Sequence, residues 1–479
     1  MTVVSRAFVF VFSLAIVASA AAALPDPVLR AFRGAGLPLS AVGVVVVDMG
    51  DHRELFAHQP ARAFSPASVM KLVTTFSALE ILGPDYRWRT RAYLDGRLER
   101  GVLRGNLVLK GGGDPKITVE QWQAFMASLR DKGLAAVEGD LVLDRSFFAP
   151  IDHDPGAFDG EPLKPYNVGP DALLVNFKSV RFAFAPNSFT DTTLVTVEPP
   201  LGRLTLGAPP KLSAAECGDW HAAIGASFVD QGSKAEALFA GRYPVACGER
   251  DWWVSLLDHP TYVHGMFETY FRAAGGRFAG GCKSGLAPRG AQPFATLESP
   301  PLWDIVRDVN KVSNNVMARQ VFLTLATAGS SQPATTGRAA DAVRRLLAKQ
   351  KLRMPELVID NGSGLSRRER ISAGSLARLL LAADASPIRD EFASSLSVAA
   401  TDGTLQRRFQ NGAVAGQALL KTGTLDGVRA LAGYVIDAAG HRFAVVAIVN
   451  HANAARAQTA LDFLVQWVYD NGASWPSSH

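Results

Sequence analysis

Ser68 and Lys71 form the first pair in the chain that could serve as a nucleophile and its base. They stand three positions apart in SPASVMKLVTT, where apolar residues recur at helical spacing, so both side chains should share one helix face. A serine hydroxyl attacks poorly unless a base takes its proton. A lysine can be that base when burial or a second cation favours its neutral amine. Alone, an S-x-x-K tetrapeptide is weak evidence, because about one chance match is expected in a chain this long.

Two later segments could complete a serine–lysine acyl-transfer site. The first is the S-x-N triplet Ser313-Asn314-Asn315, and the second is the K-T-G-T run Lys421-Thr422-Gly423-Thr424. Such a site needs a second hydroxyl to relay a proton, an amide to hold the substrate backbone, and a cation with small neighbours to receive a carboxylate. The elements S-x-x-K, S-x-N and K-T-G occur here in the chain order found in class A β-lactamases and penicillin-binding proteins.

Beyond these motifs, the sequence resembles the D-alanyl-D-alanine carboxypeptidase/endopeptidase family of low-molecular-mass penicillin-binding proteins, the penicillin-binding protein 4 type. The segments that look like its landmarks, in its order, are SPASVMKLVTT, GGGDP, GPDALLVN, the cysteine pair Cys217/Cys247, KVSNN, DNGSGLSR, TDGTL and KTGTLDGV. That family inserts two small domains between its first two motifs, which agrees with the 245 positions from Ser68 to Ser313. Asn314 stands where Asp is common, at a side chain not expected to do the chemistry.

The resemblance implies roles for the residues of the first two motifs. Ser68 would be the acylated nucleophile and Lys71 its general base. Ser313 would shuttle protons, and Asn315 would position the peptide. The backbone N–H groups of Ser68 and Thr424 would form the oxyanion hole.

The resemblance also implies a substrate-binding set. Lys421 and Thr422, with Gly423 and Thr424 beside them, would bind and polarise the peptide. Arg367, which follows GSGLS, would hold a substrate carboxylate. The alternative for Arg367 is a solvated loop arginine beside Arg368 and Arg370.

The pattern of expected helices and strands changes along the chain. We expect residues 24–85 and 291–479 to form one α/β (α+β) β-lactamase/transpeptidase-like catalytic domain, an antiparallel sheet flanked by helices. Residues 86–290, with many short strand patterns, should be an inserted β-rich region of two small domains. Within the first part, Ser65 is expected as the N-cap of the helix that carries Ser68, with Pro66 at its first position.

The N-terminus indicates export. Arg6 precedes the apolar run of residues 7–17, and small residues with A-x-A spacing follow. We therefore expect residues 1–23 to be a cleaved signal peptide and the mature protein to be periplasmic, without stable membrane insertion. An uncleaved membrane anchor is the alternative, since the apolar stretch with its alanines reaches Leu24.

The three cysteines fit an exported chain. Cys217 and Cys247 lie 30 residues apart in one region and can form a disulfide in an oxidising compartment. Cys282 would then be the unpaired cysteine. Three buried, reduced cysteines are the alternative. No H-E-x-x-H motif occurs, and Asp152-His153-Asp154 lies in a proline-flanked loop, so no metal and no cofactor is expected.

The composition of the chain limits the classes of binding partner that we expect. The chain has 479 residues, is 48% hydrophobic and 19% charged, and carries a formal net charge of +5. This is enough apolar material for a large core, and the scattered cations do not indicate nucleic-acid binding. The resemblance implies peptidoglycan peptides as partners, with β-lactam antibiotics as covalent inhibitors.

The sequence thus predicts a periplasmic serine DD-peptidase that cleaves D-Ala-D-Ala bonds, D-Ala-diaminopimelate bonds, or both. Two other functions stay open. A serine β-lactamase would need a base that activates water against the acyl ester, and no clear E-x-x-L-N element lies between Ser68 and Lys421. A non-catalytic penicillin-binding scaffold would not need the intact motif residues.

Overall fold

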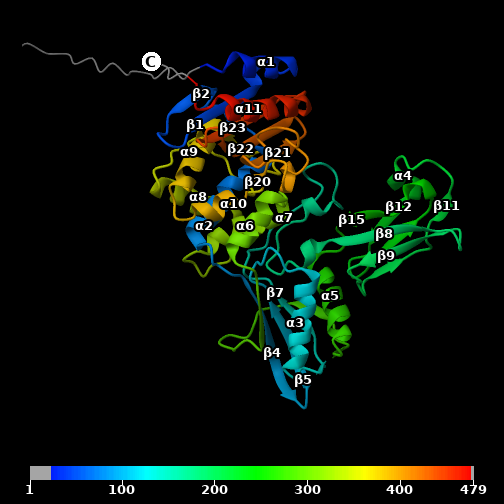
Figure 1. Cartoon of the computed structure of the whole chain (residues 1–479). Helices are drawn as coiled ribbons and strands as arrows, with labels where there is room; N and C mark the ends of the chain where they lie inside the picture. The colour runs from blue at the N-terminus through cyan, green and yellow to red at the C-terminus, as the bar shows by residue number, and fades with distance from the viewer. Residues whose placement is uncertain (1–22, 476–479) are drawn as a thin grey trace, which may run out of the picture.

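A computed structural model describes residues 23–475. The signal peptide expected at 1–23 therefore falls outside the described residues, apart from Ala23. The chain builds a main body from its two ends and an insertion from its middle (Figure 1).

A six-stranded antiparallel sheet forms the centre of the main body. In spatial order its strands are β2 (Glu54–His58), β1 (Val42–Asp48), β23 (Arg442–Asn450), β22 (Val428–Ile436), β21 (Ala418–Leu425) and β20 (Ser397–Val398). β1 is a run of β-branched valines buried on both sides, because helices cover both faces of the sheet.

Two helices cover one face of this sheet, α1 (Asp26–Gly34) and α11 (Ala457–Asn471). The C-terminal helix packs its apolar side on the terminal hairpin. The other face carries a larger layer, made of α2 (Lys71–Leu82), α6 (Leu302–Lys311), α7 (Asn315–Thr324), α8 (Thr336–Lys349), α9 (Ala373–Asp384) and α10 (Arg389–Ser394). Alternate residues of β1 enter these two cores, so the strand ties both layers together.

The insertion leaves the main body after α2 and returns before α6. Its first part is a seven-stranded sheet with α3 (Val119–Asp131) and α5 (His259–Ala273). The strands of this sheet are β4 (Arg89–Glu99), β5 (Val102–Lys110), β6 (Ala136–Val137), β7 (Leu141–Asp144), β16 (Arg277–Phe278), β17 (Cys282–Ser284) and β18 (Ala295–Glu298).

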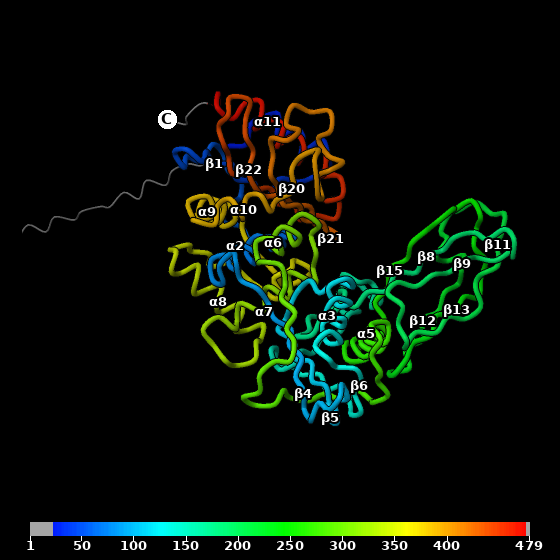
Figure 2. The backbone as a smooth tube through the Cα atoms, turned by 60° about the horizontal axis from the view of Figure 1, so that its bottom comes forward, coloured from blue at the N-terminus to red at the C-terminus, as the bar shows by residue number. Residues whose placement is uncertain are grey.

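The second part of the insertion projects sideways as a lobe of two small sheets and one short helix, α4 (Trp220–Ile224) (Figure 2). The five-stranded sheet contains β8 (Val180–Asn187), β9 (Thr192–Glu198), β11 (Lys211–Ser213), β14 (Arg242–Pro244) and β15 (Arg250–Val254). The three-stranded sheet contains β10 (Leu204–Leu206), β12 (Ala226–Asp230) and β13 (Ala235–Phe239). The predicted fold class, an antiparallel sheet flanked by helices with a β-rich insertion, is confirmed.

One local prediction is wrong. Ser65 does not cap a helix, and the segment first makes a 3₁₀ turn, η2 (Ala67–Met70), before α2 begins at Lys71. Instead, the backbone of Ser65 is held by Asn450 at the end of β23: its N–H donates to Asn450 Oδ1 at 2.7 Å, and its carbonyl accepts from Asn450 Nδ2 at 3.0 Å. This contact fixes the entry to η2 against the sheet, so no side-chain cap is needed.

Candidate active site

Ser68 and Lys71 meet at the junction of η2 and α2. The Lys71 Nζ donates to Ser68 Oγ at 2.8 Å. Lys71 is completely buried, whereas Ser68 remains partly accessible. The pair therefore presents a reachable hydroxyl to the outside and an inaccessible amine behind it, as a nucleophile and its base require.

Two more acceptors surround the Lys71 amine. Its Nζ lies 2.6 Å from Asn315 Oδ1 and 2.5 Å from the carbonyl oxygen of Ser363. With Ser68, these three partners use all three N–H donors of a protonated amine. Burial, followed by the positive charge of Lys421, lowers the pKa of Lys71 well below its usual value. Loss of a proton leaves a lone pair that can accept from Ser68 at the distance already present.

Ser313 joins the same site from the break between α6 and α7. It adopts the left-handed backbone conformation, with φ of +57°, which is uncommon for a residue with a side chain and occurs at functional sites. Its Oγ accepts from Lys421 Nζ at 2.9 Å. The neighbouring Asn314 caps α7 by accepting from the N–H of Met317 at 3.0 Å. Asn or Asp can make this cap, which explains why the departure at this position is harmless.

Lys421 is the second buried amine. Besides Ser313, it donates to the carbonyl oxygen of Thr422 at 3.0 Å. Burial lowers the pKa of Lys421 to about 7. A lysine that is fully buried with no carboxylate partner among its hydrogen bonds is costly to the fold, and such groups gather where function needs them.

The strand that carries Lys421 runs directly against η2, and a glycine makes this possible. A Cβ on Gly423 would lie 2.6 Å from the carbonyl oxygen of Pro66 and 3.3 Å from the backbone nitrogen of Ser68. Any side chain would push β21 away from the nucleophile. Next to it, Thr422 Oγ1 donates to Thr404 Oγ1 at 2.8 Å, so the TDGTL segment orients the threonine. The side chain of Thr424 is exposed beside this strand.

Glu369 supports the site, although it is not among the residues predicted from the sequence. This fully buried carboxylate accepts four backbone N–H groups at 2.8–3.1 Å, those of Asp360, Asn361, Gly362 and Gly364. The loop held in this way presents the Ser363 carbonyl to Lys71. Burial raises the pKa of Glu369, while its negative charge raises that of Lys71. An acid just beyond a Gly-Ser-Gly loop was the only sequence signal for this role.

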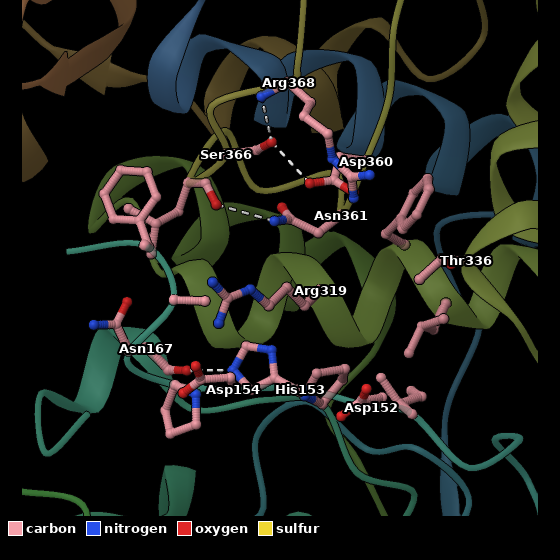
Figure 3. A pocket seen from close by; sticks show the side chains of 18 of the residues that line it. Asp152, His153, Asp154, Asn167, Arg319, Thr336, Asp360, Asn361, Ser366 and Arg368 are labelled. Carbon is pink, nitrogen blue, oxygen red and sulfur yellow. Dashed lines mark hydrogen bonds and ion pairs between the residues drawn. The ribbon is translucent and has the colours of Figure 1, made fainter. Parts of the chain in front are cut away.

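Beyond that loop lies a pocket of about 550 Å³ between the insertion and the main body (Figure 3). Residues 149–158, from the insertion, form one wall, and α7 with the segment 360–368 forms another. Arg367 lines it, and its guanidinium stacks 4.4 Å above the ring of Phe158 from the insertion. The structure thus places Arg367 at this pocket, outside the hydrogen-bonded cluster around Ser68.

Arg319 forms the inner wall of the pocket, in the middle of Figure 3. It lies one turn after Asn315 on α7, and its Nη1 donates to the carbonyl oxygen of Val168 in the insertion at 2.7 Å. Among residues 23–475, its Nε finds no hydrogen-bond partner. Burial lowers the pKa of Arg319 to about 10. Nothing in the sequence distinguished this arginine, because its burial depends on the insertion that folds over it.

The Asp152-His153-Asp154 loop also lines the pocket. His153 Nε2 is 2.6 Å from the carbonyl oxygen of Asn167, and burial lowers the pKa of this histidine. Within residues 23–475, no group of three or more His, Cys, Asp or Glu side chains is arranged to hold a metal ion.

The predicted disulfide is confirmed. Cys217 and Cys247 are bonded, and Cys282 is free. The bridge lies in the projecting lobe, between the segment before α4 and the one that follows β14. It ties together parts of the insertion that carry none of the motif residues.

Comparison with known proteins decides the family. A family model for the D-Ala-D-Ala carboxypeptidase 3 (S13) family matches residues 31–470. The chain belongs to this family. It is therefore a serine D-Ala-D-Ala carboxypeptidase of the penicillin-binding type, as the sequence predicted.

Members of the S13 family are similar to the chain over most of its length. The D-alanyl-D-alanine carboxypeptidase DacB of Haemophilus influenzae is 24% identical over 419 residues, which cover 86% of this chain and 85% of that protein. A D-alanyl-D-alanine carboxypeptidase of an Actinomadura species is 28% identical over 445 residues, 88% of this chain and 79% of that protein.

Solved structures agree on the S13 fold. The crystal structure of penicillin-binding protein 4 from Haemophilus influenzae superposes with a TM-score of 0.79 at 22% identity, covering 93% of this chain and all of that one. A second structure of that protein, in complex with a β-lactam, gives a TM-score of 0.74 at 21% identity, again over 93% and 100% of the two chains. In the part of our chain that is described, no helix combines the length and apolar character needed to cross a bilayer.

Proposed function

We propose that the protein cleaves peptidoglycan peptides next to a D-alanine in the periplasm, through an acyl-enzyme on Ser68. One observation carries this proposal: a completely buried Lys71 amine lies 2.8 Å from a partly accessible Ser68 hydroxyl. The signal-peptide pattern of residues 1–23 and the Cys217–Cys247 disulfide support the location.

The acylation step follows from the contacts of Lys71. The neutral amine takes the Ser68 proton as Oγ bonds to the carbonyl carbon of the penultimate D-alanine. The backbone N–H groups of Ser68 and Thr424 stabilise the oxyanion. The C–N bond then breaks, and the leaving amine receives the proton from Lys71 through Ser313. Water later cleaves the ester and restores the Ser68 hydroxyl.

The substrate is held on both sides of Ser68. Asn315, already bonded to Lys71, donates its side-chain amide to the peptide backbone. Protonated Lys421 and the Thr422 hydroxyl receive the terminal carboxylate, with Gly423 keeping strand β21 close enough for both to reach it.

The pocket beside the site fits the side chain of a diamino acid. Asp152 and Asp154 offer carboxylates to an amine, and Arg367 offers a guanidinium to a carboxylate. Diaminopimelate in the stem peptide carries both groups at the end of its side chain. Binding energy gained there is remote from the reacting bond and favours the long peptide over small acyl donors.

Intact-mass analysis after incubation with benzylpenicillin tests the nucleophile. We expect one covalent adduct, mapped to the SPASVMK peptide, and none in the Ser68→Ala variant. An adduct that persists in Ser68→Ala would overturn the assignment. Release of the adduct within seconds would favour the β-lactamase function instead.

The pocket is tested by comparing Arg367→Ala with Arg368→Ala. Both arginines are exposed in the same loop, but only Arg368 pairs with Asp360. We expect Arg367→Ala to lower kcat/KM for a diaminopimelate muropeptide by about tenfold, the loss of one charge-assisted contact. Penicillin acylation should stay unchanged in both variants. Equal muropeptide rates for the two variants would contradict the assignment of Arg367.

A further inference from the structure

A cluster of cations occupies the end of α8 and the loop after it. Five of them fall within ten residues and all are exposed, namely Arg344, Arg345, Lys349, Lys351 and Arg353. Within residues 23–475, only Arg344 among these five has an ion-pair partner, Asp341 at 2.8 Å. The other acid of this stretch, Glu356, already accepts hydrogen bonds from Ser372 and Ser375. The face therefore carries a concentrated, uncompensated positive charge.

These cations border an apolar groove of about 560 Å³. Its apolar lining includes Leu347, Leu352, Met354 and Leu357, and Arg344 and Arg353 stand at its edges. Leu352, Met354 and Leu357 are only partly buried against the core. We call the five cations and this groove the basic groove. Apolar side chains surrounded by cations match a surface that has anions above an apolar layer.

The basic groove lies away from the active site. In Figures 1 and 2, α8 is on the side of the main body opposite the projecting lobe of the insertion. The motif residues and the pocket of Figure 3 lie between these two sides, because the insertion covers α7 and contacts Arg319. A partner held at the basic groove would leave the substrate pocket open.

We propose that the basic groove docks the protein on a bilayer that contains anionic phospholipids. The cations contact the headgroups, and the exposed parts of Leu352 and Met354 enter the boundary between headgroups and acyl chains. A water-soluble polyanion would attract the same cations but would give those side chains nothing apolar to contact. This binding is peripheral and reversible, and it is independent of the reaction at Ser68.

Docking in this way orients the molecule. With the C-terminal end of α8 toward the lipid, the projecting lobe of the insertion points away from the bilayer, toward polymer that lies beyond it. The substrate of the proposed reaction is such a polymer, so docking would raise the local concentration of productively oriented enzyme at the lipid surface.

Vesicle co-sedimentation of the mature chain tests the proposal. The vesicles contain phosphatidylcholine alone or with 30% phosphatidylglycerol, at low salt. The test variant is Arg345→Gln/Lys349→Gln/Lys351→Gln/Arg353→Gln. The matched control, Arg97→Gln/Arg100→Gln/Lys132→Gln/Arg277→Gln, removes four exposed cations from the insertion. Penicillin acylation checks that both variants are folded.

We expect binding only to the phosphatidylglycerol vesicles, a loss of about 10²-fold or more in the test variant, and little change in the control, since each cation near the surface contributes about fivefold. Leu352→Asn/Met354→Asn should weaken vesicle binding further at moderate salt but leave binding to inorganic polyphosphate unchanged. Equal losses in the test and control variants would mean that net charge alone acts, and would overturn the proposal. Binding to polyphosphate as tight as to vesicles, with no effect of the apolar substitutions, would also overturn it and indicate a soluble polyanion.

Discussion

Replacing Lys421 by Met should stabilise the fold while removing function. The folded state holds Lys421 fully buried with a pKa of about 7, against an ordinary value of 10.5. Each pH unit between these values corresponds to ~1.4 kcal/mol, so burying this amine costs about 5 kcal/mol below pH 7. Methionine fills similar space without a charge, but Ser313 loses a hydrogen bond worth about 1–2 kcal/mol. The expected net gain in unfolding free energy is about 3 kcal/mol at pH 6.

The sign of the pH dependence follows from proton binding. Between pH 7 and 10.5 the unfolded wild type binds a proton at Lys421 that the folded state does not, so wild-type stability rises with pH relative to the variant. The advantage of Lys421→Met should therefore shrink by ~1.4 kcal/mol per pH unit above pH 7 and nearly vanish by pH 9.

Urea titrations of both proteins at pH 6, 7, 8 and 9 measure this difference. Lys349→Met, which removes an exposed lysine, is the matched control and should give a small difference that does not vary with pH. A variant that is less stable than wild type at pH 6, or a gain in stability that is independent of pH, would contradict this prediction. Either result would show that the Lys421 amine is solvated or paired with a negative charge in the folded state.

The other predictions concern the base, its support and the disulfide. Lys71→Arg should lower the benzylpenicillin acylation rate by about 10²-fold or more, because arginine keeps the charge but stays protonated; near-normal acylation would assign the base elsewhere. Glu369→Gln should shift the acid limb of the acylation rate to lower pH, because the carboxylate raises the pKa of Lys71; a rate loss with an unshifted limb would mean that Glu369 only shapes the loop. Reduction of Cys217–Cys247 should destabilise the insertion by about 3 kcal/mol. The lobe should then become sensitive to proteolysis before acylation is lost. If protease resistance and acylation were lost together, the lobe and the active site would not be independent.

The parts of the site that rest on local spacing could be predicted from the sequence. Ser68 and Lys71 lie on adjacent turns, so their contact needs only the helical geometry of that segment. The order of the S-x-x-K, S-x-N and K-T-G motifs can be read from the sequence, and it predicted that Ser313 and Lys421 belong to one site. Both contacts are present in the structure.

The parts that depend on distant backbone contacts could not be predicted. The N-cap expected at Ser65 fails because Asn450, 385 positions away, binds its backbone instead. Glu369 acts through four backbone N–H groups, and backbone donors leave no signature in a sequence. Arg319 is buried only because the segment around Val168 in the insertion folds over it. In each case the partner is chosen by tertiary packing.

The pairing of β1 with β23 also sets when the enzyme can become active. Their register runs from Val42 opposite Val449 to Asp48 opposite Phe443. β1 lies near the start of the chain and β23 near its end, so β1 can pair only after β23 has been synthesised. The insertion between them is continuous in sequence and can fold as the chain emerges, whereas the sheet that backs the nucleophile closes only after nearly the whole chain has been released. A polypeptide still being synthesised would thus carry Ser68 without a competent site, and a chain truncated before β23 would stay inert. An enzyme built in this way stays inactive until nearly the whole chain has been made and β1 has paired with β23.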